Sequence, residues 1–279
     1  MLEKFSFSQS SLQDYADCPR RFQLRYIEHL SYPANEFEQT IENEKHQQEG
    51  QQFHRLVQQA LIGIPTKSLS KMANTPNLAR WWDSFQSFSS TDLSGLTGLH
   101  PEVTLSAPLG KFRLLAKYDL VAFEKDKVII YDWKTYRRRP RNEWLSARWQ
   151  TRVYRALLVA AGTKLNGGKP ISPEQCEMVY WFTNFPDQPA VFPYSDVQYK
   201  RDWDALTRLT NEIISASDGS TSLDAAFPQT DDRQACTYCP YRSYCDRGVQ
   251  AGDFDNATAE LETESLFDLN FEQIGEIEF

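Results

Sequence analysis

Two aspartates and a lysine near the middle of the chain have the types and spacing of a metal-dependent hydrolytic site. Asp119 lies in the segment FRLLAKYDLVAF, and Asp132 and Lys134 end the segment KVIIYDWK. Residues two apart on a strand share a face, so Asp132 and Lys134 should point the same way, and a hairpin can bring Asp119 alongside. Neighbouring carboxylates repel each other unless a cation lies between them, and Mg²⁺ or Mn²⁺ suits oxygen ligands. A nearby lysine can orient a water molecule or offset transition-state charge, although a hairpin with ordinary surface side chains fits the same pattern.

A glutamine and a tyrosine four residues apart follow this hairpin. On a helix, Gln150 and Tyr154 fall within an apolar arc that also contains Val153, Leu157 and Leu158. Polar groups on an inward face need partners, and here they would lie against the sheet that carries Asp132. Simple hydrogen bonding in the core is an equally good explanation. The opposite side of the helix is expected to face solvent and carries Arg148, Arg152 and Arg155.

Two further residues are candidate metal ligands, and a basic run follows the lysine. His54 lies in the helical segment GQQFHRLVQQAL and becomes a ligand if its face meets the carboxylates; otherwise it is structural. Glu102 is a weaker candidate of the same type. The basic run would lie at the mouth of the site, where phosphates approach, and consists of Arg137, Arg138, Arg139 and Arg141. Nearby Trp144 and Trp149 could stack on bases, although core packing is expected for at least one of them.

The cysteines form a third feature. Cys236, Cys239 and Cys245 lie within ten residues of one another, and Cys18 could complete a four-cysteine site for zinc or an iron–sulfur cluster. Only one Cys-x2-Cys pair is present, which favours [4Fe–4S] over a zinc ribbon. Such a site would join the two ends of the chain across about 220 residues, worth roughly 5 kcal/mol in loop-closure entropy. Unrelated free thiols are the alternative, and Cys176 is expected to be a buried small hydrophobe.

The elements that must position these residues follow an α/β plan. A helix should begin at Ser8 or Ser10 and be interrupted at Pro19. Further helices are expected over residues 50–62, around Trp81, and over 142–161 and 196–215. Strands are expected over residues 102–109, 112–123, 127–134, 177–183 and 190–194, and loops over 65–76 and 89–98.

Charge and hydropathy exclude some classes of protein. The net charge is −8, but residues 251–279 hold nine acidic side chains and no Lys or Arg, which leaves 29 acidic against 30 basic residues before them. The acidic segment is expected to be a flexible tail: a solvated appendage, a partner-binding segment, or a mimic of DNA over the basic mouth. The longest apolar run, residues 156–161, is too short to span a bilayer, and no signal peptide is evident, so a cytoplasmic protein is expected.

Taken in chain order, these motifs resemble the iron–sulfur branch of the PD-(D/E)XK nucleases. This branch includes RecB-like and AddB-type nuclease domains and the small exonucleases of CRISPR adaptation. The resemblance covers residues 6–247, from the SxSxLxxYxxCPRRF stretch containing Cys18 to the three closing cysteines. Between them lie Gly50-x3-His54, Asp119, Asp132-x-Lys134 and Gln150-x3-Tyr154. One departure is Ala116, where the family often has glycine.

The resemblance implies a restriction-endonuclease-like core, with a mixed central sheet flanked by helices. It implies a nuclease domain over residues 1–250, with cluster elements at 1–30 and 230–247, followed by the tail at 251–279. The four cysteines would hold a [4Fe–4S] cluster, with zinc as the alternative.

The resemblance also implies a mechanism. Asp119, Asp132, the Trp133 carbonyl and His54 would hold Mg²⁺ or Mn²⁺, and Lys134 would position or deprotonate water. Gln150 and Tyr154 would contact the strand or fix Lys134. The substrate would be DNA, with single-stranded ends or flaps preferred, and the partner a helicase or a recombination or adaptation protein. The alternatives are a catalytically weak or inactive DNA-binding scaffold and a zinc-stabilised binding protein.

Overall fold

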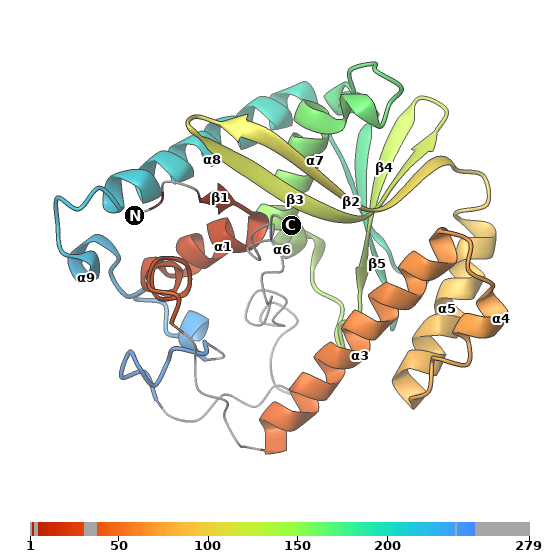
Figure 1. Cartoon of the computed structure of the whole chain (residues 1–279), viewed down its shortest axis with the longest axis horizontal. Helices are drawn as coiled ribbons and strands as arrows, with labels where there is room; N and C mark the ends of the chain where they lie inside the picture. The colour runs from red at the N-terminus through yellow and green to blue at the C-terminus, as the bar shows by residue number, and fades with distance from the viewer. Residues whose placement is uncertain (1, 3–4, 31–37, 238, 249–279) are drawn as a thin grey trace, which may run out of the picture.

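The structure, a computed structural model, describes residues 2, 5–30, 38–237 and 239–248 (Figure 1). The acidic segment 251–279, predicted to be a tail, lies outside these residues. None of the described helices combines the length and the apolar character needed to cross a membrane.

A mixed six-stranded sheet forms the centre of the fold. Its strands are β1 (Ser6–Phe7), β2 (Thr97–Leu109), β3 (Phe112–Glu124), β4 (Lys127–Lys134), β5 (Cys176–Phe182) and β6 (Ala190–Pro193). Antiparallel pairing joins β2 to β3, β3 to β4, and β5 to β6, while β1 is parallel to β3 and β4 is parallel to β5. The predicted mixed sheet flanked by helices is therefore confirmed.

Strand β3 has different partners along one of its edges. Strand β2 covers its other edge nearly throughout, whereas β1 pairs only with Arg113 and Leu114, and β4 pairs only with the stretch that begins at Leu120. Strand β4 continues past this stretch alongside β5, so that Asp132 lies opposite Tyr180. The two central strands thus separate just before Leu120, and backbone groups become available there.

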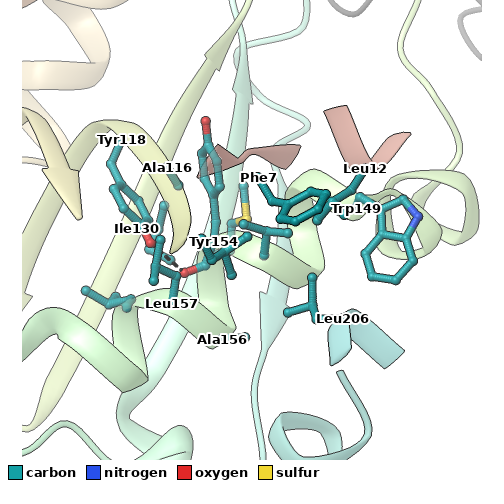
Figure 2. Packing of buried hydrophobic residues seen from close by; sticks show 14 of the residues in the cluster. Phe7, Leu12, Ala116, Tyr118, Ile130, Trp149, Tyr154, Ala156, Leu157 and Leu206 are labelled. Carbon is teal, nitrogen blue, oxygen red and sulfur yellow. Dashed lines mark hydrogen bonds between the residues drawn. The ribbon is translucent and has the colours of Figure 1, made fainter. Parts of the chain in front are cut away.

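Helices cover both faces of the sheet (Figure 1). One face packs against α1 (Gln9–Asp17), α7 (Trp149–Ala161) and α8 (Asp196–Ala216), and the other against α3 (Glu38–Leu61), α4 (Thr66–Leu69) and α5 (Pro76–Thr91). Val128 and Ile130 of β4 belong to the first core, and Ile129 and Trp133 to the second. A strand buried on both faces is expected to be continuously apolar, as residues 128–131 of this strand are, before the buried Asp132 and Lys134. Figure 2 shows the first core, in which Ile130 packs near Tyr154 and Leu157.

Short elements complete the part of the chain that the structure describes. They are α2 (Pro19–Phe22), a π-helical turn (Gln23–Ile27), α6 (Asn142–Ala147), α9 (Leu223–Ala226) and three 3₁₀ turns (Gly162–Lys164, Pro173–Gln175 and Gln234–Cys236). As predicted, Ser8 caps α1 by accepting from the Ser11 N–H, and Pro19 starts a new helix.

Three element boundaries differ from the predictions. Helix α3 begins at Glu38 rather than near residue 50, and α5 and β2 each extend into the predicted loop 89–98. The predicted helix over 142–161 is two helices, because Arg148 adopts an extended conformation with ψ 144°.

The prediction that the arginine side of α7 faces solvent was wrong for Arg155. This residue is 4% exposed, because α8 covers that side of the helix. Its Nε donates to the Thr151 carbonyl, and its Nη2 lies 3.8 Å from Asp202 Oδ2. Arg152 Nε also donates to Asp202, at 2.8 Å. The arginine stripe is therefore largely an interface between two helices.

Candidate active site

Asp119 lies where β3 and β4 separate, and two groups bind its carboxylate. The Trp133 N–H, which no longer faces a β3 carbonyl, donates to Asp119 Oδ2 at 2.8 Å. His54 Nδ1, from α3, lies 3.1 Å from the other oxygen. Burial acts to raise the pKa of the Asp119 carboxyl, but the His54 imidazole, the Trp133 N–H and the Lys134 charge outweigh it and lower this pKa. The carboxylate is thus held ionised.

A third ligating side chain joins this pair. One ligating atom from each of His54, Glu102 and Asp119 lies within 4.8 Å of the others, and among the described residues no second set of three or more His, Cys, Asp or Glu side chains meets this criterion. Glu102 lies on β2 between the cross-strand pairs Pro101–Leu120 and Val103–Tyr118, which places it across from Asp119. It adopts φ +54°, an uncommon conformation for a residue with a side chain. Its carboxylate also pairs with Lys117.

This group differs from the ligand set expected from the sequence. It contains the weaker candidate Glu102 and not the carboxylate of Asp132. The register of the hairpin could have identified Glu102 as a stronger candidate ligand. The hairpin turns at Gly110, with φ +60°, and this register places Glu102 across from Asp119. A role for the Trp133 carbonyl stays a prediction.

Asp132 and Lys134 form a buried ion pair instead. Lys134 Nζ lies 2.7 Å from Asp132 Oδ2, and the two side chains are 1% and 4% exposed, respectively. Gln150 of α7 contacts both: its Nε2 donates to Asp132 Oδ1 at 2.9 Å, and its Oε1 accepts from Lys134 Nζ at 3.2 Å. The rings of Tyr136 and Tyr180 flank the ammonium, with centroids 5.7 and 5.3 Å away. The lysine is therefore fixed by charge, hydrogen bonding and aromatic faces together.

The side chain of Tyr154 points toward β3. Its hydroxyl donates to the Lys117 carbonyl at 2.8 Å, and its own carbonyl accepts from Tyr118 at 3.0 Å. The two rings pack with centroids 4.8 Å apart (Figure 2). Burial, followed by the Asp132 and Asp119 charges, raises the pKa of Tyr154, so its hydroxyl stays protonated. In this structure Tyr154 contacts the sheet, and of the predicted pair it is Gln150 that contacts Lys134.

Helix α3 packs closely against the chain that follows Lys134. A side chain at Gly50, one turn before His54, would place its Cβ 3.1 Å from Thr135 Oγ1, a tight contact that would require Thr135 to shift. His46 Nε2 lies 3.0 Å from the Thr135 carbonyl. On the other side, Asn184 Nδ2 donates to the Tyr136 carbonyl at 2.8 Å. Sequence reasoning missed His46 and Asn184, whose partners are backbone groups distant in sequence.

The basic run after Lys134 has two kinds of member. Arg139 serves the fold: its Nε donates to the Gln188 carbonyl at 2.7 Å, and one Nη donates to Asn142 Oδ1 at 2.8 Å. The other three, Arg137, Arg138 and Arg141, are exposed. The predicted tryptophans are each covered by an arginine: Arg148 lies over the ring of Trp144, and Arg152 over the buried Trp149.

Four of the five cysteines line one pocket. Cys18, Cys236, Cys239 and Cys245 face it, together with four arginines, namely Arg20, Arg21, Arg242 and Arg247. Burial raises the pKa of Cys239 to about 11. Cys176 lies apart in the first core, and burial raises its pKa to about 12. The ends of the described chain therefore meet at a thiol-lined, arginine-rich pocket.

The chain is similar to known proteins in sequence and in structure. The chain is similar to a protein titled SSO0001 (14% identity, 88% of this chain and 87% of that one, TM-score 0.42). It is also similar to a protein from Eubacterium rectale named as a proposed exonuclease (10% identity, 78% and 83%, TM-score 0.48). No curated protein matches the chain. The sequence model of the PD-(D/E)XK nuclease superfamily matches residues 6–246, and the chain therefore belongs to this superfamily.

Proposed function

We propose that the chain is a divalent-metal-dependent deoxyribonuclease that cleaves phosphodiester bonds at single-stranded DNA ends or flaps. The observation that carries this proposal is the fixed, buried Asp132–Lys134–Gln150 arrangement beside the His54–Glu102–Asp119 group. A buried ion pair is costly unless it is fully hydrogen-bonded, and a hydrophobic pair of the same volume would serve stability as well. A lysine held beside an acidic group is what phosphodiester hydrolysis needs.

The donors fit a hard divalent ion. Two carboxylates and one imidazole, from three different elements, already lie together, and this donor set suits Mg²⁺ or Mn²⁺. Such an ion would polarise the phosphoryl group and lower the pKa of a water ligand. Lys134 orients the attacking water and offsets charge on the phosphoryl oxygens. Gln150 keeps the side chains of Lys134 and Asp132 in place through its two hydrogen bonds.

Within this proposal, the substrate is a single strand rather than a duplex. Asp132 and Lys134 are nearly inaccessible, and a single strand has less bulk around each phosphodiester than a duplex, which supports this choice. The exposed Arg137, Arg138 and Arg141 follow Lys134 directly and would bind the flanking phosphates.

The proposal includes a [4Fe–4S] cluster held by the four pocket cysteines. The four cysteines line one pocket, and they include only one Cys-x2-Cys pair, whereas a zinc ribbon typically has two such pairs. This spacing supports the cluster over zinc. The four arginines offset the negative charge of the cluster and its thiolates, which is the electrostatic requirement of such a site.

The experiment is cleavage of end-labelled single- and double-stranded DNA by anaerobically purified protein, with Mg²⁺, with Mn²⁺ and with chelator. Asp132→Ala and Lys134→Ala should abolish cleavage. Asp126→Ala and Lys125→Ala, in the exposed turn between β3 and β4, are the matched controls and should cleave like the wild type.

Two results would contradict the proposal. Equal cleavage by all variants would remove the site assignment. Absence of cleavage by wild type that still binds DNA would support the DNA-binding scaffold instead. Iron, sulfide and zinc analysis of the same preparation decides between the cluster and zinc.

A further inference from the structure

At the break between α6 and α7, the backbone N–H of Trp149 donates to a residue that is distant in the sequence. In a continuous helix the Trp149 N–H would donate to the Leu145 carbonyl. Here the hydroxyl of Thr151 donates to that carbonyl, and the Trp149 N–H donates to Gln13 Oε1 on α1, at 3.1 Å. The side chain of the N-cap residue Arg148 makes no capping bond. Gln13 therefore caps α7 from another helix.

The Gln13 carboxamide is held in one orientation. Its Nε2 donates to Asp17 Oδ1 at 2.6 Å, so its oxygen is the end that faces Trp149. Asp17 is in turn bound by Arg21, whose Nη2 donates to Asp17 Oδ2 at 2.7 Å. Arg21 is one of the arginines that line the cysteine pocket, where Cys239 is another lining residue. A polar chain thus runs from the cysteine pocket to the first residue of α7.

The residue capped in this way is next to Gln150. The Gln150 carboxamide contacts both Asp132 and Lys134, so a small tilt of the first turn of α7 moves it relative to both groups. One turn before Gln13, Gln9 Nε2 lies 3.5 Å from the Tyr154 hydroxyl. Helix α1 therefore contacts α7 at Trp149, the neighbour of Gln150, and at Tyr154.

We propose that Gln13 is a positioning residue of the active site, which fixes the N-terminus of α7 and thereby holds Gln150 against Asp132 and Lys134. Gln13 does not touch substrate; it acts through Trp149 and Gln150. The inference rests on the proposed nuclease function for its kinetic consequence and on the structure alone for the cap.

Three variants test the inference. Gln13→Leu removes both hydrogen bonds at similar volume. Gln13→Glu keeps an acceptor for the Trp149 N–H, since a carboxylate is favourable at a helix N-terminus, but loses the donor to Asp17. Gln52→Leu is the matched control at an exposed position of α3.

Two readouts are measured: hydrogen exchange of the Trp149 amide, and kcat and KM for single-stranded DNA cleavage. In Gln13→Leu we expect Trp149 exchange to accelerate and kcat to fall about tenfold, with KM changed less than about twofold, because displacing a catalytic group affects the reacting geometry more than binding. Gln13→Glu should keep the slow Trp149 exchange and most of kcat. Gln52→Leu should match the wild type in both readouts.

Unchanged Trp149 exchange and kcat in Gln13→Leu would overturn the inference, as would a Gln13→Glu variant that loses protection as fully as Gln13→Leu. If the wild type fails to cleave DNA, the proposed function fails, while the exchange data still decide whether Gln13 caps α7.

Discussion

At the scale of single residues, the central question is which carboxylates would bind the proposed divalent ion. Glu102, across the hairpin from Asp119, has the strongest structural case, and Asp132 is already engaged by Lys134 and Gln150. Glu102→Gln should raise the Mn²⁺ concentration needed for half-maximal cleavage about tenfold or more, because a neutral amide oxygen is a weaker ligand than a carboxylate. The measurement is a metal titration of cleavage, with the exposed Glu124→Gln as control.

Saturating metal should restore much of the Glu102→Gln activity. An unchanged metal requirement would exclude Glu102 and return the third ligand to Asp132 or the Trp133 carbonyl.

The thiols give a second residue-scale prediction, which depends on pH. Only the thiolate reacts with an alkylating reagent, and the pKa of Cys176 is raised to about 12 by burial. At pH 8 native protein should leave Cys176 unmodified, and the thiolate fraction rises only about tenfold for each pH unit. Mass spectrometry of peptides from protein alkylated natively and after unfolding measures this difference. Native modification of Cys176 at a rate close to that in unfolded protein would contradict its burial.

At the scale of elements, the sequence was informative where local pattern decides structure. The apolar runs of β3 and β4 predicted these two strands, because the pattern of apolar residues is a local property of the sequence. Pro19 predicted a helix boundary, because proline lacks the backbone N–H that a helix interior requires. The start of α3 was missed because residues 38–49 lack apolar periodicity, although Glu, Gln and Lys are good helix formers. The break at Arg148 was invisible because its stabilising partner, Gln13, lies 136 residues from Trp149.

The contact between α7 and α8 was also not predicted. Its contribution to the free energy of unfolding can be measured. Asp202, 1% exposed, accepts from Arg152 and from Tyr194, and lies near Arg155. Asp202→Ala leaves the buried Arg155 without its acidic neighbour and should cost about 3–5 kcal/mol in the free energy of unfolding. Asp204→Ala, exposed on the same helix, should cost less than about 0.5 kcal/mol. Urea unfolding measures both, and equal costs would show that the network does not stabilise the α7–α8 interface.

At the scale of the whole molecule, the same elements connect the candidate active site and the cysteine pocket. The separation of β3 and β4 creates the position of Asp119. Helix α3 places His54 beside Asp119, α7 places Gln150 beside Lys134, and α1 joins α7 to the cysteine pocket. The separate motifs are visible in the sequence, since each lies in a short segment, and the roles predicted for them stay predictions. The relation between the two sites could not be read from the sequence, because it depends on contacts between α1 and α7 that no local pattern encodes.

The cysteine pocket also joins the ends of the described chain, and this predicts how stability depends on it. Cys18 and Cys236 enclose more than two hundred residues, so the proposed cluster, if it stays bound in the unfolded chain, would lower the loop entropy of that chain by an amount worth roughly 5 kcal/mol. Cys18→Ala should lose the bound metal and unfold at a markedly lower temperature. Cys176→Ala, which removes a thiol from the core rather than from the pocket, should keep its full metal content although it too loses packing.

Metal analysis and thermal unfolding of both variants, purified anaerobically, separate the two effects. Because burial raises the pKa of Cys239 to about 11, its thiol is protonated at neutral pH, and binding of the metal must displace that proton. Reloading of metal-depleted wild type should therefore become more favourable as the pH rises from 6 to 8. Full metal content in Cys18→Ala would show that the N-terminal cysteine is not a ligand, and the stabilising link between the two ends would have to come from packing alone.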